Sequence, residues 1–129
     1  MELPEELKDL LDGIHFATLA TVMADGSPQA STMWVDRDGD RIRFNTAEGR
    51  VKPRNLDRDP RVAVSIYNAD DPYESYAIQG RVIEKRHEGA DAHIDALAQK
   101  YLGTDTYPYR RKGEVRVTYV VEVDRVAGH

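Results

Sequence analysis

The chain has 129 residues, no cysteine and a formal net charge of −5 at pH 7. This length fits one compact domain, residues 1–129, with a hydrophobic core of its own. The lack of cysteine excludes a disulfide framework, a thiolate metal site and a cysteine nucleophile, and it suits a cytoplasmic protein. With a mean hydropathy of −0.63, the sequence predicts neither a signal peptide nor a membrane span.

The chain opens with a predicted short helix over residues 4–11, followed by a strand. Four leucines recur at helical spacing and Gly13 follows as a stop signal, so we expect this helix to close one end of a barrel. Residues 15–23 are rich in β-formers and apolar on both faces, which predicts a strand that is covered on both sides. The four leucines are Leu3, Leu7, Leu10 and Leu11.

Two Asp-Gly turns, at 25–26 and 38–39, separate the next strands. The return strand at 28–36 carries polar side chains that are candidates for facing a ligand, and the strand at 41–46 alternates apolar and polar residues. A helix is then expected to begin between Gly49 and Pro53, because proline is tolerated only in the first turn of a helix.

The second half of the chain predicts two strands, a helix and a last strand. The strands cover residues 61–67 and 75–85, and Gly80 within the second indicates a bulge or a close approach of two backbones. Residues 88–102 show helical spacing with Gly103 at the C-terminal cap. The alternating segment 114–126 completes six strands, which together with few helices predict a mainly β, antiparallel barrel.

The sequence lacks the usual catalytic signatures. It contains no nucleophile elbow, zinc-protease motif, P-loop or dinucleotide fingerprint. Its four histidines are scattered, and His87 and His93 do not share a helix face, so we predict no metal site and read both as surface or core residues. No catalytic residue is identified, and any redox chemistry would have to come from a bound cofactor.

Residues 50–61 are strongly basic within an acidic chain. Five cations stand against two carboxylates there, a net charge of +3, which leaves −8 on the rest of the chain. A loop that enters a helix offers free backbone N–H groups, and Arg50 and Lys52 add full charges, so the segment predicts a phosphate site. The alternative is a solvated helix face on which Glu48 and Asp57 pair with the cations. A nucleic-acid-binding barrel is disfavoured by the overall negative charge.

The chain resembles the split β-barrel flavin and deazaflavin oxidoreductases, the superfamily of pyridoxamine 5'-phosphate oxidase. Within it, the chain is most similar to the small actinobacterial branch that uses coenzyme F420. The specific part of the resemblance is residues 45–56, and the segments 16–21, 25–29, 34–36, 59–63, 89–94 and 100–103 follow in the order typical of the family.

This resemblance implies an FMN-binding-like split β-barrel of six antiparallel strands in Greek-key order. It also implies a homodimer with the cofactor site between the subunits, and an F420-dependent oxidoreductase that transfers a hydride to or from a small organic substrate. No nucleic acid or membrane partner is implied. The implied cofactor-binding residues are Gln29, Ser31, Trp34, Thr46, Ala47, Arg50, Lys52 and Asn55.

Several alternatives stay open at this point. FMN also combines a tricyclic ring with a phosphate, so an FMN-dependent reductase or oxidase fits the same residues, and so does a carrier that binds F420 without turnover. Solvent, Tyr73 and Tyr76 are all candidates for the proton donor. Residues 107–112 are a candidate contact for the anionic cofactor tail, with a solvated, exposed loop as the alternative. The chain ends at His129 without the C-terminal substrate-binding segment of pyridoxamine phosphate oxidases, so we do not expect the vitamin B6 reaction.

Overall fold

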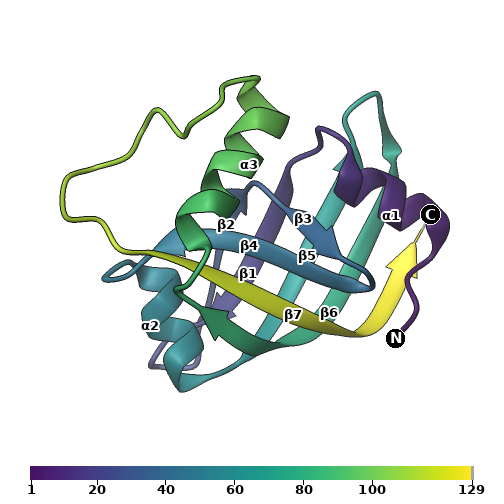
Figure 1. Cartoon of the computed structure of the whole chain (residues 1–129). Helices are drawn as coiled ribbons and strands as arrows, with labels where there is room; N and C mark the ends of the chain where they lie inside the picture. Colours follow the sequence, from purple (N-terminus) through teal and green to yellow (C-terminus); the bar gives the residue numbers. More distant parts are fainter. Residues whose placement is uncertain (129) are drawn as a thin grey trace.

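The computed structural model describes residues 1–128, and within that range three helices accompany a single antiparallel sheet of seven strands (Figure 1). None of these helices is long and apolar enough to cross a membrane. In chain order the elements are α1 (Glu5–Asp12), β1 (Ala17–Val22), β2 (Pro28–Met33), β3 (Asp36–Asp38), β4 (Arg41–Ala47), α2 (Val51–Arg58), β5 (Arg61–Asn68), β6 (Asp71–Arg86), α3 (Ala90–Leu102) and β7 (Arg116–Gly128).

The sheet is rolled into a barrel that stays open along one seam. The strand order is β2-β1-β5-β6-β7-β4-β3, so β2 and β3 are its two edges although they follow one another in the chain. Because β2 and β3 do not pair with each other, the barrel is split between them. The mainly β, split-barrel fold predicted from the sequence is therefore confirmed.

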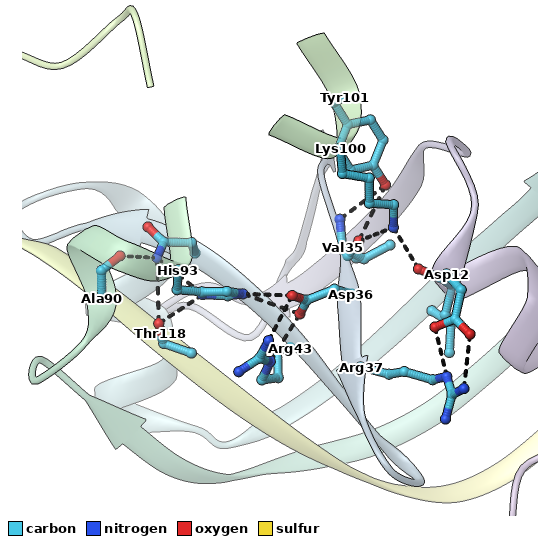
Figure 2. Close-up of polar contacts among 12 residues, drawn as sticks. Asp12, Val35, Asp36, Arg37, Arg43, Ala90, His93, Lys100, Tyr101 and Thr118 are labelled. Carbon is cyan, nitrogen blue, oxygen red and sulfur yellow. Dashed lines mark hydrogen bonds and ion pairs between the residues drawn. The ribbon is translucent and has the colours of Figure 1, made fainter. Parts of the chain in front are cut away.

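The predicted number of six strands is wrong, because the expected strand at 28–36 ends early. It breaks at Trp34 and Val35, and the chain re-enters the sheet as the short strand β3 on the opposite edge. Side chains of α3 satisfy the backbone of Val35 there. Its N–H donates to Tyr101 Oη over 3.2 Å, and its carbonyl oxygen accepts from Lys100 Nζ over 2.7 Å (Figure 2). A backbone whose polar groups are bonded to side chains needs no strand partner.

The core lies inside the barrel, and α1 closes one end of it. The leucines predicted to face inward are buried, with Leu7 and Leu11 fully so. Phe44 on β4 and Tyr119 on β7 stack in the interior, with ring centroids 5.3 Å apart. Each fully buried Leu or Phe contributes about 1.5–3 kcal/mol to folding, so α1 is part of the barrel's stability.

Strand β7 is buried on both faces. Its predicted alternation holds, since Val117, Tyr119, Val121 and Val123 point into the core. The other face, which carries Arg116, Thr118 and Val120, is buried as well. Helix α3, which contacts β4 and β7, covers it (Figure 1). This second buried face is what the sequence pattern did not reveal, and it borders the candidate site.

Strand β1 is covered on only one face within the chain. Ala17, Leu19 and Thr21 are buried in the core, whereas Thr18 on the opposite face is exposed and Ala20 is half-buried. The predicted burial of both faces is therefore not achieved by one chain alone. The open side of β1 continues across exposed small residues of β5 and β6.

Candidate functional site

The predicted phosphate segment forms a sharp turn between β4 and the N-terminus of α2. Gly49 takes a positive φ of 86°, a backbone conformation that glycine adopts without strain. Arg50 then occupies the N-cap of α2, and Pro53 lies in the first turn, where its missing N–H leaves no hydrogen bond unmade. The predicted start of this helix is confirmed. The free N–H groups and the positive end of the helix dipole lie beside Arg50 and Lys52.

These residues border a cavity of about 250 Å³. It lies between the end of β2, the turn before α2, helix α3 and the loop that joins α3 to β7. The wall combines aromatic rings with a concentration of polar and charged groups, which suits a ligand that has a flat ring system and an anionic group. The aromatic residues are Phe16, Trp34, Tyr107 and Tyr109, and the polar ones include Asn45, Thr46, Arg50, Lys52 and Arg116.

The charges around the cavity are unbalanced. Two of the three cations share one carboxylate, that of Glu114: its Oε1 lies 2.9 Å from Arg116 Nη1 and its Oε2 lies 3.3 Å from Arg50 Nη2. Lys52 forms no hydrogen bond or ion pair with the side chains that the structure describes, and the charges that act on it are those of Arg50 and Arg116. Burial, with repulsion from Arg50 and Arg116 added, lowers the pKa of Lys52. The three cations and one carboxylate therefore leave two positive charges for an anionic ligand.

Arg116 is a residue of this site that the sequence analysis missed. Its side chain is only 3% exposed, and its Nε donates to Asn45 Oδ1 over 2.9 Å. The guanidinium lies over the ring of Tyr107, 5.1 Å from the centroid. In the sequence, Arg116 lies on the face of the last strand opposite its alternating apolar residues. A solvent-exposed arginine would occupy the same position, so this pattern alone does not indicate a cavity residue.

Behind Asn45 a buried polar network continues to β3 (Figure 2). Asn45 Nδ2 donates to the carbonyl oxygen of Ala90 over 2.9 Å and lies 3.2 Å from His93 Nδ1. His93 Nε2 lies 3.1 Å from Asp36 Oδ1, and Asp36 also binds Arg43. Burial opposes ionisation of Asp36, but the hydrogen bonds from His93 and Arg43 outweigh it and lower the pKa of that carboxyl. His93 is thus a core residue, one of the two predicted alternatives.

The structure brings four of the eight predicted binding residues to the cavity and places the other four elsewhere. The lining residues are Trp34, Thr46, Arg50 and Lys52, whereas Gln29, Ser31, Ala47 and Asn55 do not line it. Trp34 also stacks on Tyr101, with 5.3 Å between ring centroids. Trp34 therefore has both a ligand-facing and a packing role.

Asn55, at the end of the basic motif, connects α2 to β1. It is buried, and its Nδ2 donates to Thr21 Oγ1 over 2.9 Å while its Oδ1 accepts from Arg58 over 2.7 Å. Gln29 and Ser31 lie on β2, opposite Thr21 and Leu19 of β1. The buried Ser31 Oγ has no hydrogen-bond partner among residues 1–128.

The loop over residues 107–112 contributes aromatic rings to the cavity. Tyr107 and Tyr109 line it. Arg110 instead turns to α3, where it pairs with Asp91 and Asp95 at 2.6 Å each, so its charge is already neutralised. The backbone N–H of Tyr107 also donates to Asp95 over 2.8 Å. These contacts hold the loop against α3.

Comparisons with known proteins agree with this architecture. A family model described as pyridoxamine 5'-phosphate oxidase matches residues 3–129. The structure is similar to that of an F420 reductase, with 34% sequence identity, a TM-score of 0.86, and coverage of 97% of this chain and 98% of the other.

Two more distant structures share the fold. The conserved hypothetical protein Rv2991 from Mycobacterium tuberculosis is 23% identical, with a TM-score of 0.77 over 99% of this chain and 84% of that one. HupZ from Group A Streptococcus is 20% identical, with a TM-score of 0.69 over 98% of this chain and 93% of that one.

The split barrel and its cationic, aromatic-walled cavity define the class of pyridoxamine 5'-phosphate oxidase-like flavin and deazaflavin proteins. The match of the family model over almost the whole length identifies the family directly. The chain belongs to the pyridoxamine 5'-phosphate oxidase family.

Proposed function

We propose that this protein binds the deazaflavin coenzyme F420 and acts as an oxidoreductase on a small organic substrate. The observation that carries the proposal is the charge balance of the cavity, where Arg50, Lys52 and Arg116 line the wall and Glu114 pairs with both arginines. Arg116 is buried and Lys52 is half-buried, whereas Arg50 is exposed at the mouth. A buried or half-buried cation that lacks a full counter-charge is stabilised when a ligand supplies negative charge. An anionic group is therefore the expected occupant.

The residues of the cavity fit such a cofactor. Arg50, Lys52 and the N-terminus of α2 would hold its phosphate, and Trp34 and Phe16 offer apolar surface to its ring system. When bound in its reduced form, F420 supplies a hydride. The protein's own contribution is positioning: its rigid aromatic wall fixes the ring plane, and its apolar surfaces exclude water from the reacting face.

The choice of a deazaflavin over FMN is supported by the 34% identity to an F420 reductase over nearly the full length of both chains. The charged residues do not distinguish the two cofactors, because each carries a phosphate next to a tricyclic ring. An FMN-dependent enzyme is therefore the outcome to test against.

We also infer that two copies of the chain assemble around the site. The open face of the sheet carries small, uncharged, exposed side chains, among them Thr18, Ala63 and Ala77. This face reaches the cavity, because Thr18 pairs with Thr32 and Thr32 lines the cavity. A second copy would cover both the open face and the adjoining side of the cavity.

Light scattering tests this assembly and should give the mass of a dimer for the wild type. Ala63→Arg should yield monomers that bind cofactor more weakly. A wild-type monomer would refute the assembly.

Titration of the purified protein with F420 and, separately, with FMN tests the cofactor assignment. Fluorescence polarisation should show saturable binding of F420 that is stronger than that of FMN. Arg50→Ala and Lys52→Ala should each weaken F420 binding by about 1.5–3 kcal/mol, the value of a charged hydrogen bond. Arg81→Ala is the matched control, since Arg81 forms an exposed pair with Asp124 away from the cavity.

Absence of saturable F420 binding would overturn the proposal, and preferential binding of FMN would replace F420 with a flavin. Turnover is tested by following oxidation of reduced F420 with a panel of enones, quinones and tetrapyrroles. Oxidation that depends on an added acceptor is expected. Tight binding without oxidation by any member would indicate a carrier instead.

A further inference from the structure

We propose that Arg116 is a third anion-binding residue and that it makes the site select phosphate-bearing cofactors over their phosphate-free ribosides. This inference rests on the proposed function, because it assumes that the cavity receives the cofactor's anionic group. It concerns a residue outside the basic segment 50–61, on a different strand and 66 positions after Arg50 in the chain.

Arg116 is a buried cation at the cavity wall. Its side chain is 3% exposed, yet it lines the cavity beside Arg50 and Lys52. Glu114 is shared with Arg50, so this carboxylate does not neutralise both arginines. A buried guanidinium that shares its counter-ion can gain from a second anion.

Three contacts hold the guanidinium of Arg116 in place. Its Nε donates to Asn45 Oδ1 at 2.9 Å, its Nη1 donates to Glu114 Oε1 at 2.9 Å, and its plane lies over the ring of Tyr107. Nη2 has no hydrogen-bond partner among residues 1–128. Because the planar fork is fixed before the ligand arrives, little side-chain freedom remains to be lost on binding.

Asn45 is a positioning residue for Arg116. Its Nδ2 is engaged by the Ala90 carbonyl oxygen and lies near His93 Nδ1, so its Oδ1 must face the arginine. Helix α3 thereby fixes the orientation of an arginine on β7. The arrangement is typical of a binding group that is supported by a second layer of hydrogen bonds.

The test compares two ligands on the wild type and on variants that remove the charge. Arg116→Met and Arg116→Gln are made in parallel, and thermal unfolding identifies which of them folds. The probes are F420 and the corresponding deazaflavin riboside, which lacks the phosphate and its tail. Affinity for F420 should fall about tenfold to a hundredfold, the equivalent of a charged hydrogen bond, while affinity for the riboside changes less than threefold.

Arg116→Lys serves as the rescue variant, because it restores the charge without the planar fork. It should recover part of the affinity for F420 and leave the riboside unaffected. Equal losses for both ligands in the neutral variants would assign Arg116 a purely structural role and overturn the inference, and so would unchanged affinity for F420. If neither neutral variant folds, the same comparison with Arg116→Lys decides: a loss confined to F420 supports the inference, and equal or absent losses overturn it.

The outcome separates this inference from the proposed function. If the wild type does not bind F420 at all, the function as proposed fails. The same variants are then titrated with FMN and riboflavin, a second pair that differs by a phosphate. If the variants lose affinity for FMN while their affinity for riboflavin is unchanged, the role of Arg116 is still supported.

Discussion

His93 on α3 and Asp36 on β3 are joined by a side-chain hydrogen bond at the edge of the barrel, with 3.1 Å between Nε2 and Oδ1. The pair joins two elements that are 57 positions apart in the chain. β3 has only three residues and one strand neighbour, and side-chain contacts add to its anchoring: Asp36 to His93 of α3, and Arg37 to Asp12 of α1.

We expect Asp36→Asn to destabilise the protein by about 2 kcal/mol at pH 7, because it removes charge-assisted hydrogen bonds to His93 and Arg43. The pKa of Asp36 is lowered on folding, so its ionised side chain contributes to the free energy of unfolding. This contribution is fully present above the unfolded pKa of 3.8 and is lost as the pH falls through the folded pKa. Urea unfolding should therefore show a difference in the free energy of unfolding between wild type and variant, and this difference should shrink as the pH falls. Asp124→Asn, in an exposed pair, should change stability by less than about 0.5 kcal/mol, and a gap independent of pH would contradict the assignment.

Asn55→Ala should reduce stability rather than cofactor affinity. It leaves the buried Thr21 hydroxyl without its donor and removes the acceptor for Arg58, at a cost of about 1–3 kcal/mol. Chemical denaturation measures this cost, and titration with F420 measures the affinity, which should change less than threefold. A large loss of affinity in a fully folded variant would show that Asn55 contacts the cofactor, as the sequence motif implies.

Cofactor binding should weaken as the pH rises into the alkaline range. The pKa of Lys52 is lowered in the free protein by burial and by Arg50 and Arg116, whereas a bound anion stabilises the ammonium form and raises it. Above the free-protein value, binding must therefore take up a proton, and the affinity falls with pH. Dissociation constants for F420 between pH 7 and pH 10 measure how steeply the affinity falls with pH. Lys52→Arg should flatten it, because arginine stays protonated, and equal slopes in the two proteins would refute this account.

Gly80→Ala should destabilise the barrel by about 1–3 kcal/mol. A Cβ at this position would collide with the carbonyl oxygen of Glu122 on β7, at the point where the pairing of β6 and β7 shifts register. Thermal unfolding measures the effect. The control is Glu84→Ala on the same strand, in an exposed pair with Arg86, which should change stability by less than about 0.5 kcal/mol; equal effects would argue against steric crowding.

Features that depend on local patterns were predictable from the sequence. The start of α2 follows from Pro53 and the preceding glycine, and the close backbone approach at Gly80 follows from a glycine inside a strand. The inward face of β7 follows from strict alternation. In each case the residues that determine the structure are neighbours in the chain.

Features that depend on distant contacts were not predictable in this way. Arg116 becomes a cavity residue because Ala47 pairs with it across β4 and β7 and because α3 covers that face. The break after β2 exists because two side chains of α3 reach Val35. No periodicity within a single segment encodes either arrangement, so the network behind Asn45 emerged only from the assembled fold.

The contacts from α3 to the backbone of Val35, between β2 and β3, bear on the order in which the chain folds. The partners of Val35 come from residues 65 and 66 positions later in the chain, whereas the adjoining hairpin β1–β2 joins near neighbours. Contacts of long sequence separation form late because closing the intervening loop costs entropy. We therefore expect the link between β2 and β3 at Val35 to be fixed only when the last helix docks, so that mutations in that helix accelerate unfolding more than they slow folding.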